Sequence, residues 1–218
     1  MIYLWAGTAA VGLVLQVLLI AAMLRGAYRL YRVLFVYAVV LLMTTSIEAT
    51  AVFGSGYAAG LAAYYWVGDS IRQTLLYVVV ISLILSASDQ SAKRASIGRL
   101  LIAGSLLFAV LSLYFTYNRG LDFWMTRFSR NLGFLAVILN LILWAALLKH
   151  RRPDPTLLLV SGGMGIQMAG KAIGHSLRQL RLTVTTGDLV IVLSHLLCLY
   201  IWWQAFRKPS EQPVAIPD

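Results

Sequence analysis

Apolar residues fill seven long runs along the chain, and short polar breaks separate them. The runs cover residues 2–24, 33–53, 61–85, 97–117, 132–148, 156–177 and 189–206. A membrane-spanning helix needs about 20 predominantly apolar residues, which is close to the length of these runs. The breaks carry Gly, Ser, Asp and Pro, the residues that end regular structure. The pattern therefore predicts an all-α protein with seven transmembrane helices.

Composition supports this class and indicates one domain. Of the 218 residues, 60% are hydrophobic and 12% are charged, whereas soluble domains have about 25% charged residues. We expect residues 1–208 to form a single seven-helix transmembrane domain. Residues 209–218 contain three prolines and no apolar period, so they are expected to be an extended cytoplasmic tail.

Basic residues set the expected orientation. The net charge is +10, but Lys and Arg occur in short clusters between apolar runs, as in membrane proteins rather than nucleic-acid-binding proteins. Of the 18 Lys and Arg residues, eleven fall in the loops on one side, five fall on the other, and Arg72 and Lys171 lie inside runs. Because cytoplasmic loops carry the excess of positive charge, the N-terminus is predicted outside and the C-terminus inside.

A polar stripe crosses the sixth run. Gln167, Lys171 and His175 are spaced four residues apart, so they share one face of a helix. Charged side chains at membrane depth are costly and therefore face a bundle interior, pair with one another and mark functional sites. The stripe is thus the first candidate site.

Other runs supply partners for the stripe at a similar depth. At about 1.5 Å per helical residue, all the candidates fall in the outer half of the bilayer. Asp69 and Arg72 are three residues apart and could pair within one helix, and Lys171 is expected to pair with Glu48 or Asp69. The complete predicted ligand or ion-pair network is Glu48, Asp69, Arg72, Gln167, Lys171, His175 and His195.

Three interpretations of this network remain open. Buried ion pairs can serve only to fix the packing of helices. They can also line a pocket for an anion or other ligand, or relay protons. The small-residue pair Gly170 and Gly174 likewise permits either close packing within the chain or a dimer face.

No motif of an enzyme is found in the sequence. Phosphate-binding loops, HExxH, CxxC and GxSxG are all absent, so the protein is predicted not to be an enzyme. His150 lies at the opposite membrane surface from His175 and His195, so no metal site is expected. Haem or pigment ligation by His175 or His195 stays open, because one axial imidazole suffices. A retinal protein is excluded because the last run contains no lysine.

Part of the chain resembles a known group of proteins. The stretch 28–37, Tyr-Arg-Leu-Tyr-Arg-Val-Leu-Phe-Val-Tyr, is followed by Tyr64-Tyr-Trp66 and an apolar stretch to residue 85. These segments resemble uncharacterised seven-helix proteins of environmental bacteria, although the prolines of that family near the second helix have no counterpart here. The resemblance implies a bacterial inner membrane and no particular activity.

Two functions follow as expectations. The first is a non-catalytic accessory subunit or sensor-like module that works through contacts with other membrane proteins or with a second copy of itself. The second is a small carrier or receptor that binds an anion or a proton in the outer polar pocket. The lipid bilayer is the one partner that both functions require.

Overall fold

Seven α-helices and a short 3-10 helix make up the described part of the chain, which contains no strand. The computed structural model describes residues 2–55, 59–87, 94–117, 124–148, 154–179 and 184–207. The helices are α1 (Ile2–Leu24), η1 (Ala27–Arg29), α2 (Arg32–Ser55), α3 (Ala59–Ala87), α4 (Arg94–Tyr117), α5 (Trp124–Leu148), α6 (Pro155–Gln179) and α7 (Val184–Arg207). The all-α prediction is confirmed, and the expected tail 209–218 lies outside the described residues.

Five of these helices are long and apolar enough to cross a membrane. Their qualifying segments are Gly7–Leu24, Arg32–Thr50, Val67–Ser86, Pro155–Arg178 and Thr185–Arg207. The described parts of α4 and α5 contain shorter apolar segments, Gly98–Tyr114 and Asn131–Ala145. The chain is therefore a multi-pass membrane protein by its helix lengths and composition.

Two helices begin more than one turn earlier than the apolar runs predict. Helix α5 begins at Trp124 rather than at 132, and α7 begins at Val184 rather than at 189. The segment 185–188, expected as a break, is helical. Hydropathy marks where a helix leaves an apolar environment, whereas the helical hydrogen bonds continue into the polar turns beyond it.

Local signals fix the ends of α1 and α6. Gly26 follows α1 with a φ of 132°, a left-handed conformation that glycine adopts without steric cost. Pro155 is the first residue of α6, where its missing N–H costs nothing. The carboxylate of Asp154 accepts a hydrogen bond from the Thr156 backbone N–H at 2.9 Å, which caps the helix.

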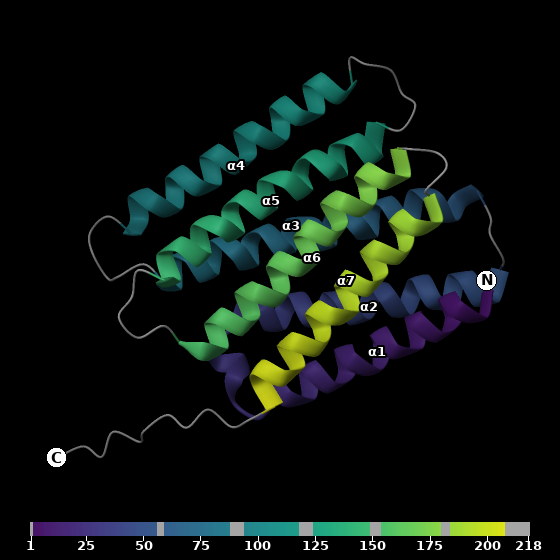
Figure 1. The fold of residues 1–218 in the computed structure, drawn as a ribbon, viewed down its shortest axis with the longest axis horizontal. Helices are drawn as coiled ribbons and strands as arrows, with labels where there is room; N and C mark the ends of the chain where they lie inside the picture. The colour runs from purple at the N-terminus through teal and green to yellow at the C-terminus, as the bar shows by residue number, and fades with distance from the viewer. Residues whose placement is uncertain are drawn as a thin grey trace.

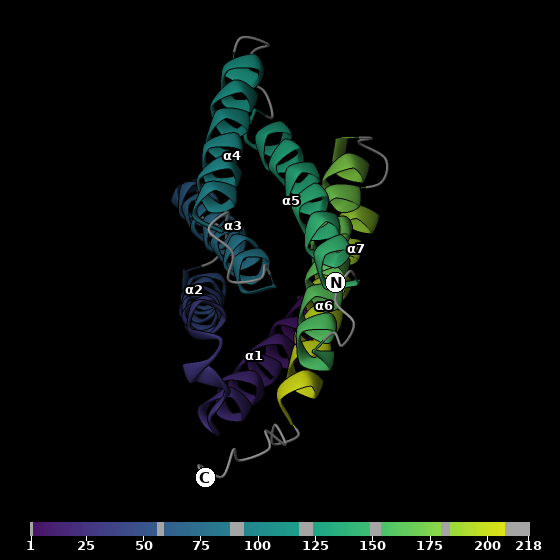
Figure 2. The same cartoon turned by 90° about the vertical axis from the view of Figure 1, so that its left-hand side faces the viewer.

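Six helices form a ring, and α4 lies outside it. Going round the ring, α1 contacts α2, α2 contacts α3, α3 contacts α5, α5 contacts α6, α6 contacts α7, and α7 returns to α1. One side of α4 packs against α3 and α5 (Figure 1). The view along the helices shows α4 at the edge of the bundle (Figure 2).

Large side chains fill the ring. Trp202 is fully buried and donates a hydrogen bond from Nε1 to the Val160 carbonyl at 2.8 Å. Its ring meets Tyr37 edge-on with centroids 5.8 Å apart, a favourable aromatic geometry. Met164 and Leu76 complete this layer with 0% and 1% of their surface exposed. The layer lies just below the candidate site and supports it.

Glycines bring α6 and α7 together. A Cβ on Gly170 would overlap Ser194, and one on Gly174 would overlap Ile191 and lie 2.7 Å from the Gly187 carbonyl oxygen. These two glycines therefore serve packing within the chain, which was one of the two predicted alternatives.

Candidate functional site

A polar cavity of about 230 Å³ lies between α1, α2, α3, α6 and α7. We call it the outer pocket, after the membrane side on which the sequence places it. Every residue of the network predicted from the sequence lines this one cavity. The seven residues are Glu48, Asp69, Arg72, Gln167, Lys171, His175 and His195.

Two ion pairs cross the outer pocket from one helix to another. The Arg72 guanidinium on α3 lies 2.9 Å from the Glu48 carboxylate on α2. The Lys171 ammonium on α6 donates a hydrogen bond to the Asp69 carboxylate on α3 at 3.0 Å. All four side chains have 21% or less of their surface exposed. Helix α3 thus sends one charge toward α2 and one toward α6.

This pairing selects among the predicted alternatives. Lys171 was expected to meet Glu48 or Asp69, and the structure shows Asp69. Arg72, for which a pair with Asp69 within α3 was considered, bonds Glu48 on α2. Residues three apart on a helix point about 60° apart around its axis, so Asp69 and Arg72 can reach partners on different neighbouring helices.

Neutral polar groups form the floor of the outer pocket. Gln167 donates from Nε2 to the Tyr37 hydroxyl at 3.4 Å, and Gln16 donates from Nε2 to the Thr45 hydroxyl at 3.2 Å. The Oε1 atoms of both glutamines and Nδ1 of His175 are buried and have no hydrogen-bond partner among the described residues. Such buried polar atoms cost free energy unless something else satisfies them.

Three of these residues were missed by the sequence reasoning. Gln16 is the one polar residue between 9 and 24, and that isolation was a usable signal. Tyr37 and Thr45 gave no such signal, because aromatic residues and hydroxyls are common in membrane helices. Only the tertiary structure turns them toward the outer pocket.

The histidines lie in the outer pocket without forming a metal centre there. His175 is 5% exposed on α6, and His195 on α7 lines the same cavity. In the described ranges, no group of three or more His, Cys, Asp or Glu side chains could hold a metal ion. Haem or pigment ligation by a single imidazole stays a prediction.

A third ion pair closes the outer end of the α6–α7 contact. Arg178, expected in a loop, belongs to α6 and contacts the Asp188 carboxylate at the start of α7. The pair lies one turn beyond His175 on α6. It joins the two helices that carry Lys171 and His195 at one end of the outer pocket.

Comparisons with known proteins add no relative. The sequence matches no protein-family model, no curated protein and no solved structure. The resemblance to seven-helix bacterial proteins therefore stays a prediction, and the function must be argued from the outer pocket itself.

Proposed function

We propose that all seven helices cross a bacterial inner membrane, with the N-terminus outside and the C-terminus inside. The apolar segments of α4 and α5 and the eleven-to-five distribution of loop Lys and Arg support this arrangement. It places the outer pocket in the periplasmic half. A reporter that works only in the cytoplasm should be active when it is fused after residue 218. Activity of a reporter that works only in the periplasm would refute the orientation.

We further propose that the protein is a carrier or receptor that binds a small zwitterionic solute in the outer pocket. The observation that carries this proposal is the two pairs of opposite charges that face one cavity from three helices. Their formal charges cancel, so a ligand with a net charge would leave an uncompensated charge at low dielectric. A zwitterion adds no net charge.

The geometry allows the charged side chains of the outer pocket to exchange their protein partners for the charged groups of such a solute. A ligand carboxylate could accept hydrogen bonds from Arg72 or Lys171, and a ligand ammonium group could donate to Asp69 or Glu48. The glutamine and histidine atoms that have no partner among the described residues supply further hydrogen bonds. The volume of about 230 Å³ limits the ligand to a small metabolite.

A purely structural network fits these features less well. Ion pairs that only fix helix packing are expected to close against each other without leaving a cavity or unsatisfied atoms beside them. Here both accompany the pairs. The outer pocket therefore favours ligand binding over packing alone.

The test is ligand-induced thermal stabilisation of the full chain in mild detergent. The probes are glycine, alanine and proline as zwitterions, with acetate and methylammonium as singly charged controls of similar size. A zwitterion at 100 times its Kd should contribute about 2.7 kcal/mol, which corresponds to roughly 5–10 °C for a chain of this size.

Variants tie the effect to the outer pocket. The double variant Lys171→Met, Asp69→Asn removes one pair and should abolish the shift. Arg25→Gln, at an exposed position remote from the outer pocket, should leave it intact. Stabilisation by acetate alone, or a shift that survives in the double variant, would overturn the zwitterion proposal.

A second candidate function is the accessory subunit. It is favoured by α4, whose main contacts within the described residues are with α3 and α5 and whose Leu100, Leu106 and Val110 are more than 60% exposed. A peripheral apolar helix can meet either lipid or another membrane protein. Native mass analysis of gently solubilised protein distinguishes the functions, because a stoichiometric protein partner supports the subunit and a bound metabolite supports the carrier or receptor. An absorption band in the same sample would indicate haem or pigment.

A further inference from the structure

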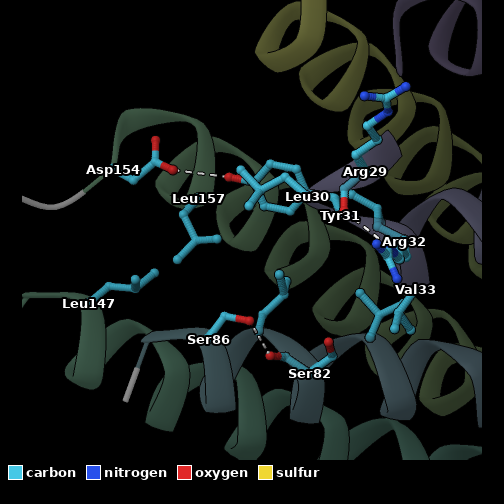
Figure 3. A pocket seen from close by; sticks show the side chains of 13 residues that line it. Arg29, Leu30, Tyr31, Arg32, Val33, Ser82, Ser86, Leu147, Asp154 and Leu157 are labelled. Atoms are coloured by element: carbon cyan, nitrogen blue, oxygen red, sulfur yellow. Dashed lines mark hydrogen bonds between the residues drawn. The ribbon is translucent and has the colours of Figure 1, made fainter. Parts of the chain in front are cut away.

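A second and larger cavity, of about 560 Å³, lies at the other end of the bundle. It is bordered by the beginning of α2, the end of α3, the end of α5 and the beginning of α6 (Figure 3). We call it the inner cavity. It shares no lining residue with the outer pocket.

One wall of the inner cavity is apolar. It is made by buried side chains from four helices, of which each has 8% or less of its surface exposed: Leu34, Val79, Leu83, Leu147 and Leu157. The lining also includes Leu30, which has 65% of its surface exposed, and covering this apolar surface with hydrocarbon rather than water is favourable. The wall therefore suits an aliphatic chain.

The same helices also give the inner cavity polar and basic lining residues. Arg32 donates from Nε to the Arg29 carbonyl at 3.3 Å, which positions its guanidinium beside α3 (Figure 3). Ser82 and Ser86 project from α3 toward the cavity (Figure 3). Within the described residues, neither Arg29 nor Arg32 forms an ion pair with a carboxylate. The Arg29 guanidinium donates from Nε to the Tyr28 hydroxyl at 3.1 Å, so Arg32 is the cation available to an anionic ligand.

The single acidic residue of the lining is already engaged. Asp154 accepts hydrogen bonds from the Tyr31 hydroxyl at 3.0 Å and from the Thr156 backbone N–H at 2.9 Å. The first of these bonds joins the beginning of α2 to the beginning of α6 across the cavity mouth (Figure 3). Asp154 therefore shapes the inner cavity and repels an anion less than a free carboxylate would.

We propose that the inner cavity binds an anionic phospholipid, with its phosphate at Arg32 and an acyl chain along Leu30 at the apolar wall. The cavity lies at helix ends, the depth at which lipid headgroups meet the protein. Arginine forms bidentate hydrogen bonds with phosphate oxygens, and basic pockets between membrane helices bind anionic headgroups. A soluble anion would leave the exposed Leu30 uncovered, so a cation and an exposed apolar side chain in one cavity favour a lipid.

The test measures thermal stability and retained lipid on the full chain in detergent. The probes are micelles containing phosphatidylglycerol, micelles containing phosphatidylcholine, and inorganic phosphate at the same concentration. Phosphatidylglycerol should raise the melting temperature by several degrees and remain bound in native mass spectra, whereas phosphatidylcholine should act several-fold more weakly. Inorganic phosphate should have no effect.

Matched substitutions locate the binding. Arg32→Gln should remove most of the phosphatidylglycerol shift, and Arg32→Lys should retain part of it. Arg25→Gln, an equally exposed arginine at the same end of the bundle but outside the lining, should behave as the unmodified protein. Ser82→Phe fills the cavity and should also weaken retention.

Three outcomes would overturn the proposal. Equal shifts with the two lipids would show that charge is not recognised, and an equal shift with inorganic phosphate would show that the hydrocarbon wall is not used. Equal losses in the Arg25 and Arg32 variants would show non-specific attraction to the basic end of the protein. None of these outcomes depends on solute binding in the outer pocket.

Discussion

The outer pocket and the inner cavity differ in whether their cationic side chains form ion pairs. In the outer pocket, Arg72 and Lys171 each meet a carboxylate from another helix within about 3 Å. At the inner cavity, Arg29 and Arg32 are exposed and form no ion pair within the described residues. A charge deep in the bundle loses its hydration and requires a partner. A charged side chain at the interface stays hydrated and can bind a ligand without breaking an ion pair.

The two cavities are close neighbours along α2. Leu34 lines the inner cavity and Tyr37 lines the outer pocket, so about 4.5 Å of helix separates them. Both side chains are 2% exposed or less. The two cavities nevertheless share no lining residue, which allows each to be changed without the other.

The largest expected effect is the loss of a partner in the outer pocket. Lys171→Met leaves the Asp69 carboxylate without its hydrogen-bonded cation and should cost about 3–5 kcal/mol of unfolding free energy. Thermal unfolding in detergent measures the loss. At the inner cavity, Arg32→Gln removes an exposed charge and should change stability by about 0.5 kcal/mol or less in the absence of lipid.

Second substitutions distinguish the pairs. Adding Asp69→Asn to Lys171→Met should restore part of the stability, because both charges of one pair are then gone. Adding Glu48→Gln should restore none, because Glu48 is the partner of Arg72. Recovery with Glu48→Gln instead would reassign the pairs, and recovery with neither would refute the network.

A smaller effect is expected where helix packing shapes the outer pocket. Gly174→Ala places a methyl group against Ile191 and the Gly187 carbonyl, and overpacking of this kind costs about 1–3 kcal/mol. It should also weaken zwitterion binding while leaving phosphatidylglycerol binding unchanged. The control is Gly104→Ala on α4, where a Cβ meets nothing within 4 Å. That change should be neutral or stabilise the helix by up to about 1 kcal/mol. Equal destabilisation by both would contradict the close contact.

The smallest effect is expected at the mouth of the inner cavity. Tyr31→Phe removes the hydrogen bond to Asp154 and should cost about 1 kcal/mol, since the contact is partly exposed. Burial, together with the nearby Asp154 carboxylate, raises the pKa of Tyr31 above its ordinary value of 10.0. The folded state therefore holds this proton more tightly than the unfolded state.

The sign of this shift fixes the pH dependence. The contribution of Tyr31 should be complete below about pH 10 and should be lost as the pH rises above it. The stability difference between the unmodified protein and Tyr31→Phe should accordingly shrink in alkaline buffer. A difference that stays constant between pH 8 and 11 would show that the hydroxyl is not held as the structure shows.

Helix positions and the candidate residues could be read from the sequence with little error. The apolar runs lie within the seven helices, because hydrocarbon excludes polar side chains over about 20 residues. The network residues stood out because charge is rare at that depth. The polar first turns of α5 and α7 were missed for the same reason, since outside the hydrocarbon hydropathy no longer distinguishes helix from loop. The inner cavity left no signal, because its wall consists of leucines and valines that resemble any other core residues.

The sequence alone determined which side chains are too polar for lipid, and their spacing determined which of them share a helix face. Lys171 and Asp69 could therefore be named as candidates for one network. Tertiary structure decided which charges meet, because that depends on how α2, α3 and α6 are arranged around a common cavity rather than on separation along the chain. It also placed Gln16 and Tyr37 in the site, because their side chains reach it only through the packing of helices that are distant in sequence.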